Sequence, residues 1–554
     1  MNSLSDLLDA AAARRPGASA VVTEDPAGSA SVTWEELARR VAAIRGGLRE
    51  RRVGPGERVA LSLRGGPDLV AALLAVAAAG CVAVVLPTAR GRRDGAYADR
   101  LAGVWADCAP ALLIETPAEA RRRAAIEGLT AVDSADVAEL AAADPVDGPG
   151  APAHEDTPVI LQYTSGSTKR PRGVVLTAGM LAANCRQAAA VYGDHADDVA
   201  VSWVPLYHDM GLITAVIRPL FGGYTSVLLQ PADFITEPIR WLRAIDAHRA
   251  TLSSAPDFAY AHCVRRIPAQ DLEGLDLSRW RIARSAGEVV RPETMAAFTA
   301  FAAPAGFRPE TFCPSYGMAE ATLTVTASTP TARPHSIRMN PASLTPGAVA
   351  VPDPQGRELL SSGPPVPETT VRVSGADGRA GLVGELEISG PQVLGGYFHA
   401  AAPLTPDGAL RTGDLGFVLD GEVFVLGRAD DAMILNGANL FQHDLVAACA
   451  SVPGIRPGRA AAFVDDRVPD RQEVVVVAET TPGFDRAESD PAAPEHAALA
   501  AAVRARVLER LGVIVAHVQT VEAGTLPVTT SGKVQVAAIR AAWFGSKEQL
   551  TWRT

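Results

Sequence analysis

The chain has 554 residues, of which 48% are hydrophobic and 20% are charged, so it is long enough for two to four domains and apolar enough to bury large cores. Its net charge of −11 and the lack of a long basic run argue against nucleic acid as a partner. The six cysteines show no C-x-x-C spacing, which argues against a zinc site or a disulfide framework and favours a cytoplasmic location.

The first part of the chain alternates helix-like and strand-like segments. Residues 6–17 and 34–52 have the periodicity of amphipathic helices, and residues 58–63 (RVALSL) have that of a strand. The run 69–86 has no charge over 18 residues, but Gly80 interrupts it, so we expect a buried helix followed by a short strand and no membrane span. This alternation predicts an α/β architecture with largely parallel sheets.

From about residue 330 the pattern changes. Pro and Gly become frequent, and the runs 369–374 and 384–390 alternate with period two. This texture predicts a small, mostly antiparallel β region.

The last part of the chain again mixes helices and strands. Residues 468–480 predict an edge-like strand, and the Asp-, Glu- and Pro-rich stretch 481–497 predicts a loop. We expect an N-terminal domain over residues 1–427, a hinge over 428–432 and a C-terminal domain over 433–554. The predicted fold class is therefore α/β: a large N-terminal domain of α/β subdomains with a small β-rich subdomain, and a small mobile α+β C-terminal domain.

Residues 161–177 read LQYTSGSTKRPRGVVLT and have the composition of an anion-binding loop. Gly166 and Gly173 let the backbone turn tightly and bring its N–H groups close to a ligand. A P-loop is excluded because Pro171 stands five residues after Gly166 and no Gly-Lys-Ser/Thr follows. The alternative is a surface turn, which the density of Gly, Ser and Thr makes the weaker interpretation. The remaining donors and cations are Thr164, Ser165, Ser167, Thr168, Lys169, Arg170 and Arg172.

Four further stretches carry residues suited to chemistry. Taken singly, each has a simpler interpretation: a lone His is more often a core residue than a catalyst, Gly-Asp is common in turns, and a Lys is usually solvated. Together, in one order, they are improbable by chance. They are VSWVPLYHDMGLI (201–213) with His208, FCPSYGMAEATLTVT (312–326) with Tyr316 and Glu320, LRTGDLGFVLDGEVFVLGRADD (410–431) with Asp414 and Arg428, and LPVTTSGKVQ (526–535) with Lys533.

The order of these motifs resembles the adenylate-forming superfamily of acyl-CoA synthetases, nonribosomal peptide adenylation domains and luciferases, over nearly the whole chain. The resemblance is sharper with the fatty acyl-AMP ligase branch, which has motifs similar to SWVPLYHDMGLI (202–213), to residues 255–295 and to YGMAEATL (316–323). It implies ATP-dependent activation of a carboxylic acid, a fatty acid in this branch, to acyl-AMP with release of pyrophosphate. The acyl group would then pass to the phosphopantetheine thiol of an acyl carrier protein.

The resemblance also implies a role for each nucleotide-binding residue. The loop 164–173 would handle the β- and γ-phosphates of ATP, and Glu320 would hold Mg²⁺ near the α-phosphate. Tyr316 would stack on the adenine, while Asp414, assisted by Arg428, would accept hydrogen bonds from the ribose hydroxyls. The expected nucleotide-binding residues are Thr164, Ser165, Gly166, Ser167, Thr168, Arg172, Gly287, Tyr316, Gly317, Asp414 and Arg428.

Three residues would act in catalysis by the same resemblance. Lys533 would bridge the acyl carboxylate and the phosphate, His208 would lie at the acyl end of the pocket, and Glu320 would act through the metal ion. Asp430 matches the hinge about which the small domain rotates between the two half-reactions. The alternatives are a CoA ligase with the same first step, and an inactive scaffold that binds only nucleotide or a carrier protein.

The sequence departs from the family pattern at three places. Lys169 replaces a Gly and Arg172 replaces a Lys of the usual phosphate loop, although Arg keeps the charge. The stretches LNGANLFQHDLV (435–446) and SAGEVV (285–290) also differ from the usual motifs. In the fatty acyl-AMP ligase branch an insertion in the large domain is expected to discourage CoA as the acceptor. Residues 334–363 resemble the region that precedes the SCG-like motif of that branch, which favours an acyl carrier protein as the acceptor.

Overall fold

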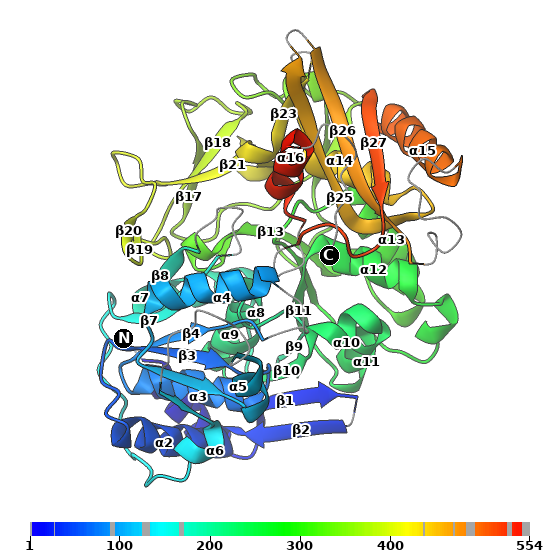
Figure 1. Cartoon of the computed structure of the whole chain (residues 1–554). Coiled ribbons are helices and arrows are strands. Elements are labelled where there is room, and N and C mark those ends of the chain that lie inside the picture. The colour runs from blue at the N-terminus through cyan, green and yellow to red at the C-terminus, as the bar shows by residue number, and fades with distance from the viewer. Residues whose placement is uncertain are drawn as a thin grey trace.

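The computed structural model describes residues 3–26, 28–88, 95–123, 133–164, 171–435, 438–468, 471–482, 494–528 and 534–545. Figure 1 shows a large N-terminal domain with a small C-terminal domain above it, as the sequence predicts. The large domain contains two eight-stranded sheets and a four-stranded sheet.

The first eight-stranded sheet is parallel from β13 to β1 and has an antiparallel strand at each end. Because β9, β11, β12 and β13 are parallel, their carboxyl ends lie at the same edge of the sheet. In spatial order the strands are β14 (Thr324–Ala327), β13 (Phe312–Gly317), β12 (Ile282–Ser285), β11 (Leu252–Ala255), β9 (Val199–Ser202), β10 (Thr225–Leu229), β1 (Ser19–Asp25) and β2 (Gly28–Thr33).

The second eight-stranded sheet is parallel from β7 to β6 and antiparallel from β7 to β20. Successive residues of β3 are buried on opposite faces of the sheet. Val59 and Leu61 belong to the main core with α3, whereas Ala60 packs against α4. In spatial order the strands are β20 (Ala400–Ala401), β19 (Gly396–Tyr397), β8 (Gly173–Thr177), β7 (Pro158–Tyr163), β4 (Val82–Val85), β3 (Arg58–Ser62), β5 (Leu112–Glu115) and β6 (Ser134–Ala135).

Smaller sheets complete both domains. The β-rich region predicted after residue 330 is an antiparallel sheet of β17 (Thr370–Val373), β18 (Gly384–Ser389), β21 (Leu410–Leu419) and β22 (Glu422–Arg428), with a separate pair β15 (Ser336–Met339) and β16 (Arg357–Leu360). The C-terminal domain has the hairpin β23 (Ala432–Leu435) and β24 (Ala438–Phe441), and a sheet of β25 (Ile455–Val468), β26 (Arg471–Thr480) and β27 (Val515–Val521).

Two expectations for the C-terminal domain were wrong. The strand expected at an edge is β26, which lies between β25 and β27, and its residues Val474 to Val477 are fully buried because both faces are covered. Of the expected loop 481–497, residues from Pro494 onward already belong to helix α15, and residues 483–493 lie outside the described part.

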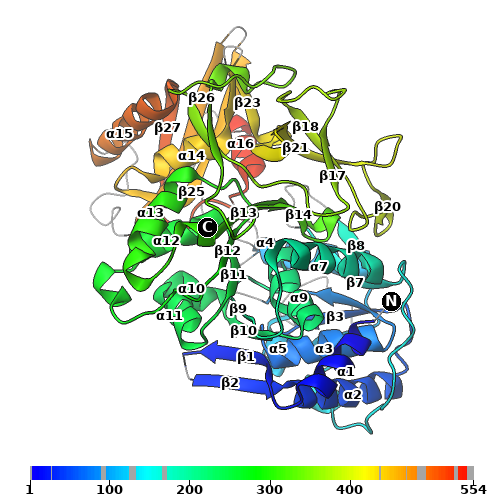
Figure 2. The ribbon, with the colours of Figure 1, turned by 180° about the vertical axis from the view of Figure 1, so that it is seen from behind.

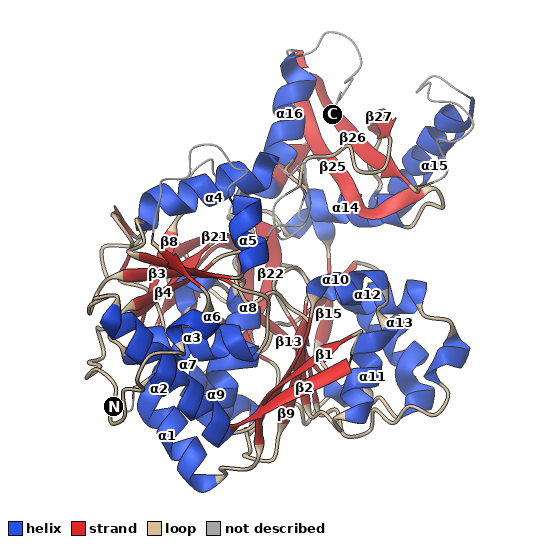
Figure 3. Ribbon diagram, turned by 60° about the horizontal axis from the view of Figure 1, so that its bottom comes forward, coloured by secondary structure: helices blue, strands red, loops and turns tan. Residues whose placement is uncertain are grey.

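The helices cover the faces of the sheets. Figures 2 and 3 show α7 and α9 on the inner side of the first sheet and α12 and α13 on its outer side. The core confirms the contact of α7, because Ala188 and Tyr192 share a cluster with residues of β9, β11, β12 and β13. The α-helices are α1 (Leu4–Arg14), α2 (Trp34–Glu50), α3 (Pro67–Ala78), α4 (Gly95–Cys108), α5 (Pro117–Arg123), α6 (Val137–Leu140), α7 (Ala178–Tyr192), α8 (Asp209–Leu212), α9 (Arg218–Gly222), α10 (Pro231–Thr236), α11 (Ile239–Ala247), α12 (Asp257–Arg266), α13 (Pro292–Ala302), α14 (Gln442–Ala450), α15 (Pro494–Leu511) and α16 (Val536–Gly545).

Local sequence signals explain where these helices begin and end. In α2, Thr33 and Glu36 form the reciprocal hydrogen bonds of a capping box. The uncharged run 69–86 is a buried helix, α3, a turn at Gly80 and the buried strand β4, as predicted. Among the described residues, no helix combines the length and the apolar character that crossing a bilayer requires.

Candidate active site

The first cluster of predicted site residues joins the parallel sheet to the antiparallel sheet. The Tyr316 hydroxyl, on β13, donates a hydrogen bond of 2.6 Å to Oδ2 of Asp414, on β21. Arg428, which pairs with Asp414 across β21 and β22, places Nη1 3.3 Å from the other carboxylate oxygen and donates to the Thr412 carbonyl at 3.1 Å. Tyr316 and Asp414 are buried, whereas half of the Arg428 side chain is exposed. The sequence-predicted adenine and ribose residues therefore lie together.

Two glycines make this arrangement possible. Gly413 has φ +72°, and a Cβ atom there would lie 3.0 Å from Nη2 of Arg428. Gly317 lies at an irregularity in the β13–β14 pairing, and a Cβ atom there would lie 1.7 Å from the Leu323 carbonyl oxygen. Any other residue at either position would displace the neighbours of Asp414 or Tyr316.

The second cluster surrounds Glu320, which lies in the short helix η5 (Ala319–Ala321) directly after β13. The Tyr397 hydroxyl, on β19, donates to Oε1 of Glu320 at 2.9 Å, and the Arg172 guanidinium lies 5.3 Å from the centre of the Tyr397 ring. Burial raises the pKa of Glu320, a smaller contribution from the charge of Asp209 acts in the same direction, and the Tyr397 hydrogen bond opposes both. Glu320 is thus a carboxylate that an added cation would stabilise.

Tyr397 is a site residue that the sequence analysis missed. It pairs with Val174 of β8, which is the strand that follows the predicted phosphate loop. Its only sequence signal is the Gly-Gly-Tyr sequence at 395–397, which is too common in β regions to indicate a contact with Glu320.

The predicted phosphate loop connects two antiparallel strands, β7 and β8. Thr164 and Arg172 stand at its two ends, where the Thr164 N–H donates to the Arg172 carbonyl at 3.3 Å. The tip of the loop, with Ser165, Gly166, Ser167 and Thr168, lies outside the described residues, as does Lys533. The loop therefore lies between two strands of one sheet.

His208 and Asp209 begin helix α8, next to the contact of Tyr207 with β7. The Tyr207 carbonyl accepts a hydrogen bond of 2.6 Å from Gln162 of β7, which ties this segment to the loop. Nδ1 of His208 lies 2.6 Å from Oδ1 of Asp209. Burial alone would raise the pKa of Asp209, but His208 and the Met210 N–H hold it below its usual value. Gly287, at the end of β12, approaches this helix, since a Cβ atom there would lie 4.0 Å from Cε of Met210.

Asp430 lies in the short helix η7 (Ala429–Asp431), between β22 and the hairpin of the C-terminal domain. Burial by itself would lower the pKa of Arg428, but the charge of Asp414 raises it, and Asp430 makes a smaller contribution in the same direction. The C-terminal domain contacts the large domain close by: Arg357 of β16 forms a salt bridge of 2.8 Å with Asp444 of α14. In addition, Phe441 is buried among the residues of the β-rich region.

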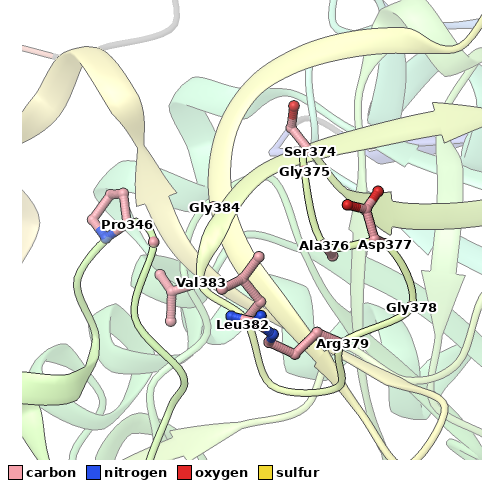
Figure 4. Close-up of a pocket in the computed structure, with 11 residues that line it drawn as sticks. Pro346, Ser374, Gly375, Ala376, Asp377, Gly378, Arg379, Leu382, Val383 and Gly384 are labelled. Atoms are coloured by element: carbon pink, nitrogen blue, oxygen red, sulfur yellow. The ribbon is translucent and has the colours of Figure 1, made fainter.

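A separate hollow of about 620 Å³ lies in the β-rich region, between the loop that joins β17 to β18 and residues 346–347. Figure 4 shows Asp377 and Arg379 on that loop. Its lining residues are distinct from the predicted site residues, so we place the candidate site at the clusters around Asp414 and Glu320.

The fold and these clusters define an adenylate-forming enzyme. The chain belongs to the AMP-binding enzyme family, whose model matches residues 8–398. It is 34% identical to the putative fatty-acid–CoA ligase FadD21 of Mycobacterium tuberculosis, over 92% of this chain and 91% of that protein. It is 33% identical to the medium-chain-fatty-acid–[acyl-carrier-protein] ligase JamA of Moorena producens, over 71% of this chain and 68% of JamA.

Solved structures agree with this assignment. A structure from a study of fatty acyl-adenylate ligases of E. coli and L. pneumophila superposes with a TM-score of 0.86 at 29% identity, covering 98% of this chain and 97% of that one. The resemblance to fatty acyl-AMP ligases and the predicted fold class are therefore confirmed, and the chain is an adenylate-forming ligase.

Proposed function

We propose that this enzyme activates a fatty acid with ATP to acyl-AMP and then transfers the acyl group to the phosphopantetheine thiol of an acyl carrier protein. One observation carries the proposal: Tyr316 and Glu320 are only four residues apart at the end of β13. Tyr316 is hydrogen-bonded to Asp414, and Glu320 is hydrogen-bonded to Tyr397. This spacing suits a ligand whose adenosine and α-phosphate are directly joined.

In the first half-reaction, a carboxylate oxygen of the acid attacks the α-phosphorus of ATP. The bond from the α-phosphorus to the bridging oxygen breaks, and pyrophosphate leaves with the electron pair. Asp414 orients the ribose and Tyr316 the adenine. Arg172, at the end of the phosphate loop, supplies positive charge for the leaving phosphates, and Lys533 bridges the carboxylate and the α-phosphate.

The residues present fit Mg²⁺, which proteins bind through one or two carboxylates together with the phosphates of the substrate. Glu320 is the carboxylate, and a bound cation would offset the burial that raises its pKa. Within the described ranges, no three His, Cys, Asp or Glu side chains come together as a metal site, so phosphate and water oxygens would complete the coordination. When bound, the ion neutralises charge on the phosphates.

In the second half-reaction, the thiol sulfur attacks the acyl carbon, the thiol proton is lost, and AMP leaves. We propose that the domain of residues 433–554 rotates relative to residues 1–427 about Asp430, within a hinge at 428–432, and removes Lys533 between the steps. A cytoplasmic location belongs to the same proposal, and it is supported by six cysteines that are all buried and unpaired.

The choice of acceptor rests on residues 334–363, which include β15 and β16. This segment contacts the C-terminal domain through Arg357 and Asp444, and such a contact would restrict the rotation unless binding of the carrier protein, which CoA cannot replace, releases it. JamA, by its name a ligase for an acyl carrier protein, supports the same choice. CoA is the second candidate acceptor, because FadD21 is named a fatty-acid–CoA ligase.

Mass spectrometry of reactions with ATP, Mg²⁺ and fatty acids of increasing length tests the proposal. Each acid is incubated alone, with CoA, and with a phosphopantetheinylated carrier protein. We expect acyl-AMP alone and acyl-carrier protein with the carrier, without acyl-CoA. Lys533→Ala should abolish acyl-AMP formation while ATP binding persists. Acyl-CoA as the main product would assign the second acceptor, and unchanged adenylation by the variant would contradict the role of Lys533.

A further inference from the structure

Arg284, near the carboxyl end of β12, is buried to 1% exposure. Its Nε donates a hydrogen bond of 2.6 Å to Oγ of Ser315, on the neighbouring strand β13. Its Nη2 is fully buried and has no hydrogen-bond partner in the described part of the protein. A guanidinium has five N–H donors, so this side chain is buried with its hydrogen-bonding capacity incompletely used.

The charges around Arg284 belong to other pairs. Arg218 of α9 forms a bidentate salt bridge with Asp194, and both side chains are 5% exposed. Asp209 is close enough for its charge and that of Arg284 to act on each other, but its carboxylate lies against His208. No salt bridge joins Arg284 to an acidic side chain anywhere in the described ranges.

The position of Arg284 connects it to the proposed acyl end of the site. Ser315, which accepts its Nε–H, directly precedes Tyr316, and Arg284 stands opposite Ser254 of β11 in the sheet register. The three strands are adjacent in Figure 2, with α7 and α9 beside them. Ligands of parallel sheets bind at the carboxyl ends of the strands, and the residues named here lie at those ends.

A buried guanidinium with an unused donor is costly, since the loss of hydration is repaid only by well-placed acceptors. In the proposed mechanism the carboxylate of the acid is engaged at the α-phosphorus and by Lys533, and the remaining hydrocarbon chain of a plain fatty acid supplies no acceptor. We propose that Arg284 is a specificity-determining residue that binds an acceptor oxygen on the acyl part of the substrate. The preferred acid is then an oxygen-substituted acid, with a hydroxyl, carbonyl or second carboxylate group, rather than an unsubstituted fatty acid. This inference rests on the proposed function, because it concerns the acid bound at the same site.

The test compares acids of equal length: octanoic acid, hydroxyoctanoic and oxo-octanoic acids substituted at each position, and octanedioic acid. Acyl-AMP formation gives kcat and KM for wild type, Arg284→Met and Arg284→Lys, and calorimetry gives binding of each acid to the protein without ATP. Arg284→Met keeps the volume and apolar stem but removes every donor. We expect wild type to prefer one class of oxygenated acid. Arg284→Met should lower kcat/KM for that class by roughly 100-fold, mainly by raising KM, and should increase kcat/KM for octanoate. The Lys variant should retain part of the preference.

Thermal unfolding separates this role from a structural one. Arg284→Met should keep or raise the melting temperature, because it removes an unsatisfied buried cation, whereas Arg218→Met should lower it by leaving Asp194 buried and unpaired. Equal use of octanoate and the oxygenated acids, unchanged by Arg284→Met, would overturn the inference and leave the proposed function standing. Binding of oxygenated acids that depends on Arg284, without any acyl-AMP, would support the inference and contradict the proposed function.

Discussion

The Tyr316 hydroxyl donates a hydrogen bond of 2.6 Å to Asp414. This buried hydrogen bond joins two sheets whose strands are far apart in the sequence. Burial, followed by the charge of Asp414, raises the pKa of Tyr316 well above its usual value, and the hydroxyl therefore remains a donor throughout the physiological range. With Arg428 near the other oxygen, the carboxylate is fixed in place before any ligand binds.

The proposed ribose contact predicts the effect of Asp414→Asn. Loss of charge-assisted hydrogen bonds should raise the KM for ATP by about 10- to 100-fold, with a smaller change in kcat. Asp407→Asn is a matched control, because Asp407 also pairs with an arginine, Arg372, but is exposed. ATP–pyrophosphate exchange at varied ATP measures both. An unchanged KM for ATP in Asp414→Asn would show that Asp414 does not contact the nucleotide.

Glu320 predicts an acid limb in the pH profile. Burial raises the pKa of Glu320 above the ordinary value of a glutamate. As the pH falls, Glu320 is therefore protonated at a higher pH than an exposed glutamate would be. We expect kcat/KM to decline over that window. Tyr397→Phe removes the hydrogen bond that favours the ionised form and should move the acid limb to higher pH. Profiles of wild type and variant at saturating Mg²⁺ check this, and coincident limbs would exclude Glu320 as the titrating group.

His443, at the start of α14, predicts a loss of stability on acidification. Burial lowers its pKa to about 4, from an ordinary value near 6.5. Between these two values the unfolded chain binds a proton that the folded protein does not, so the stability that neutral His443 allows is present above about pH 6.5 and falls as the pH drops toward 4. The slope is at most about 1.4 kcal/mol per pH unit.

His443→Gln removes this titration. The melting temperature of the variant should therefore fall less steeply than that of wild type between pH 6.5 and 4. His195→Gln is the control, because His195 is an exposed histidine in the large domain. If the melting temperatures of His443→Gln and wild type fall equally with pH, the pKa of His443 is the same in the folded and unfolded protein.

The salt bridge between Arg357 and Asp444 predicts a change in acceptor. Its two parallel contacts, of 2.8 and 2.9 Å, are partly buried, and a double-mutant cycle should give a coupling energy of about 1–3 kcal/mol. If this contact restricts domain rotation, Arg357→Ala should increase the yield of acyl-CoA relative to wild type while leaving acyl-AMP formation within about twofold. Arg338→Ala is the control, because Arg338 pairs with Glu358 inside the same small sheet. Equal acyl-CoA yields from the two variants would contradict a role for this contact.

Much of the architecture could be predicted from the sequence, because local signals agree with the fold. Gly80 marks the turn between α3 and β4, and period-two alternation marks β17 and β18. The candidate site residues Tyr316, Glu320, Asp414 and Arg428 could be selected from the sequence because each stands in a distinctive short motif. The structure then shows that the first two flank one turn and that the last two face each other across a β-ladder.

What escaped prediction depends on contacts between distant segments. Tyr397 reaches Glu320 only because β19 pairs with β8, and no local pattern records this pairing. The position of β26 at the centre of its sheet depends on β25 and β27, which cover its two edges. The unsatisfied donor of Arg284 could not be predicted either, because the sequence shows an arginine in a strand but not its missing partner.

The pairing of Tyr397 with Val174 also constrains how this segment can vary. Side chains alternate between the faces of a sheet, so a slip of one residue between β8 and β19 would turn the Tyr397 hydroxyl away from Glu320 and the Arg172 guanidinium away from its ring. Such a slip would need no change in any residue proposed to bind the nucleotide. An insertion or deletion in the connection before β19, far from the motifs in sequence, would disable the site as effectively as replacing Glu320.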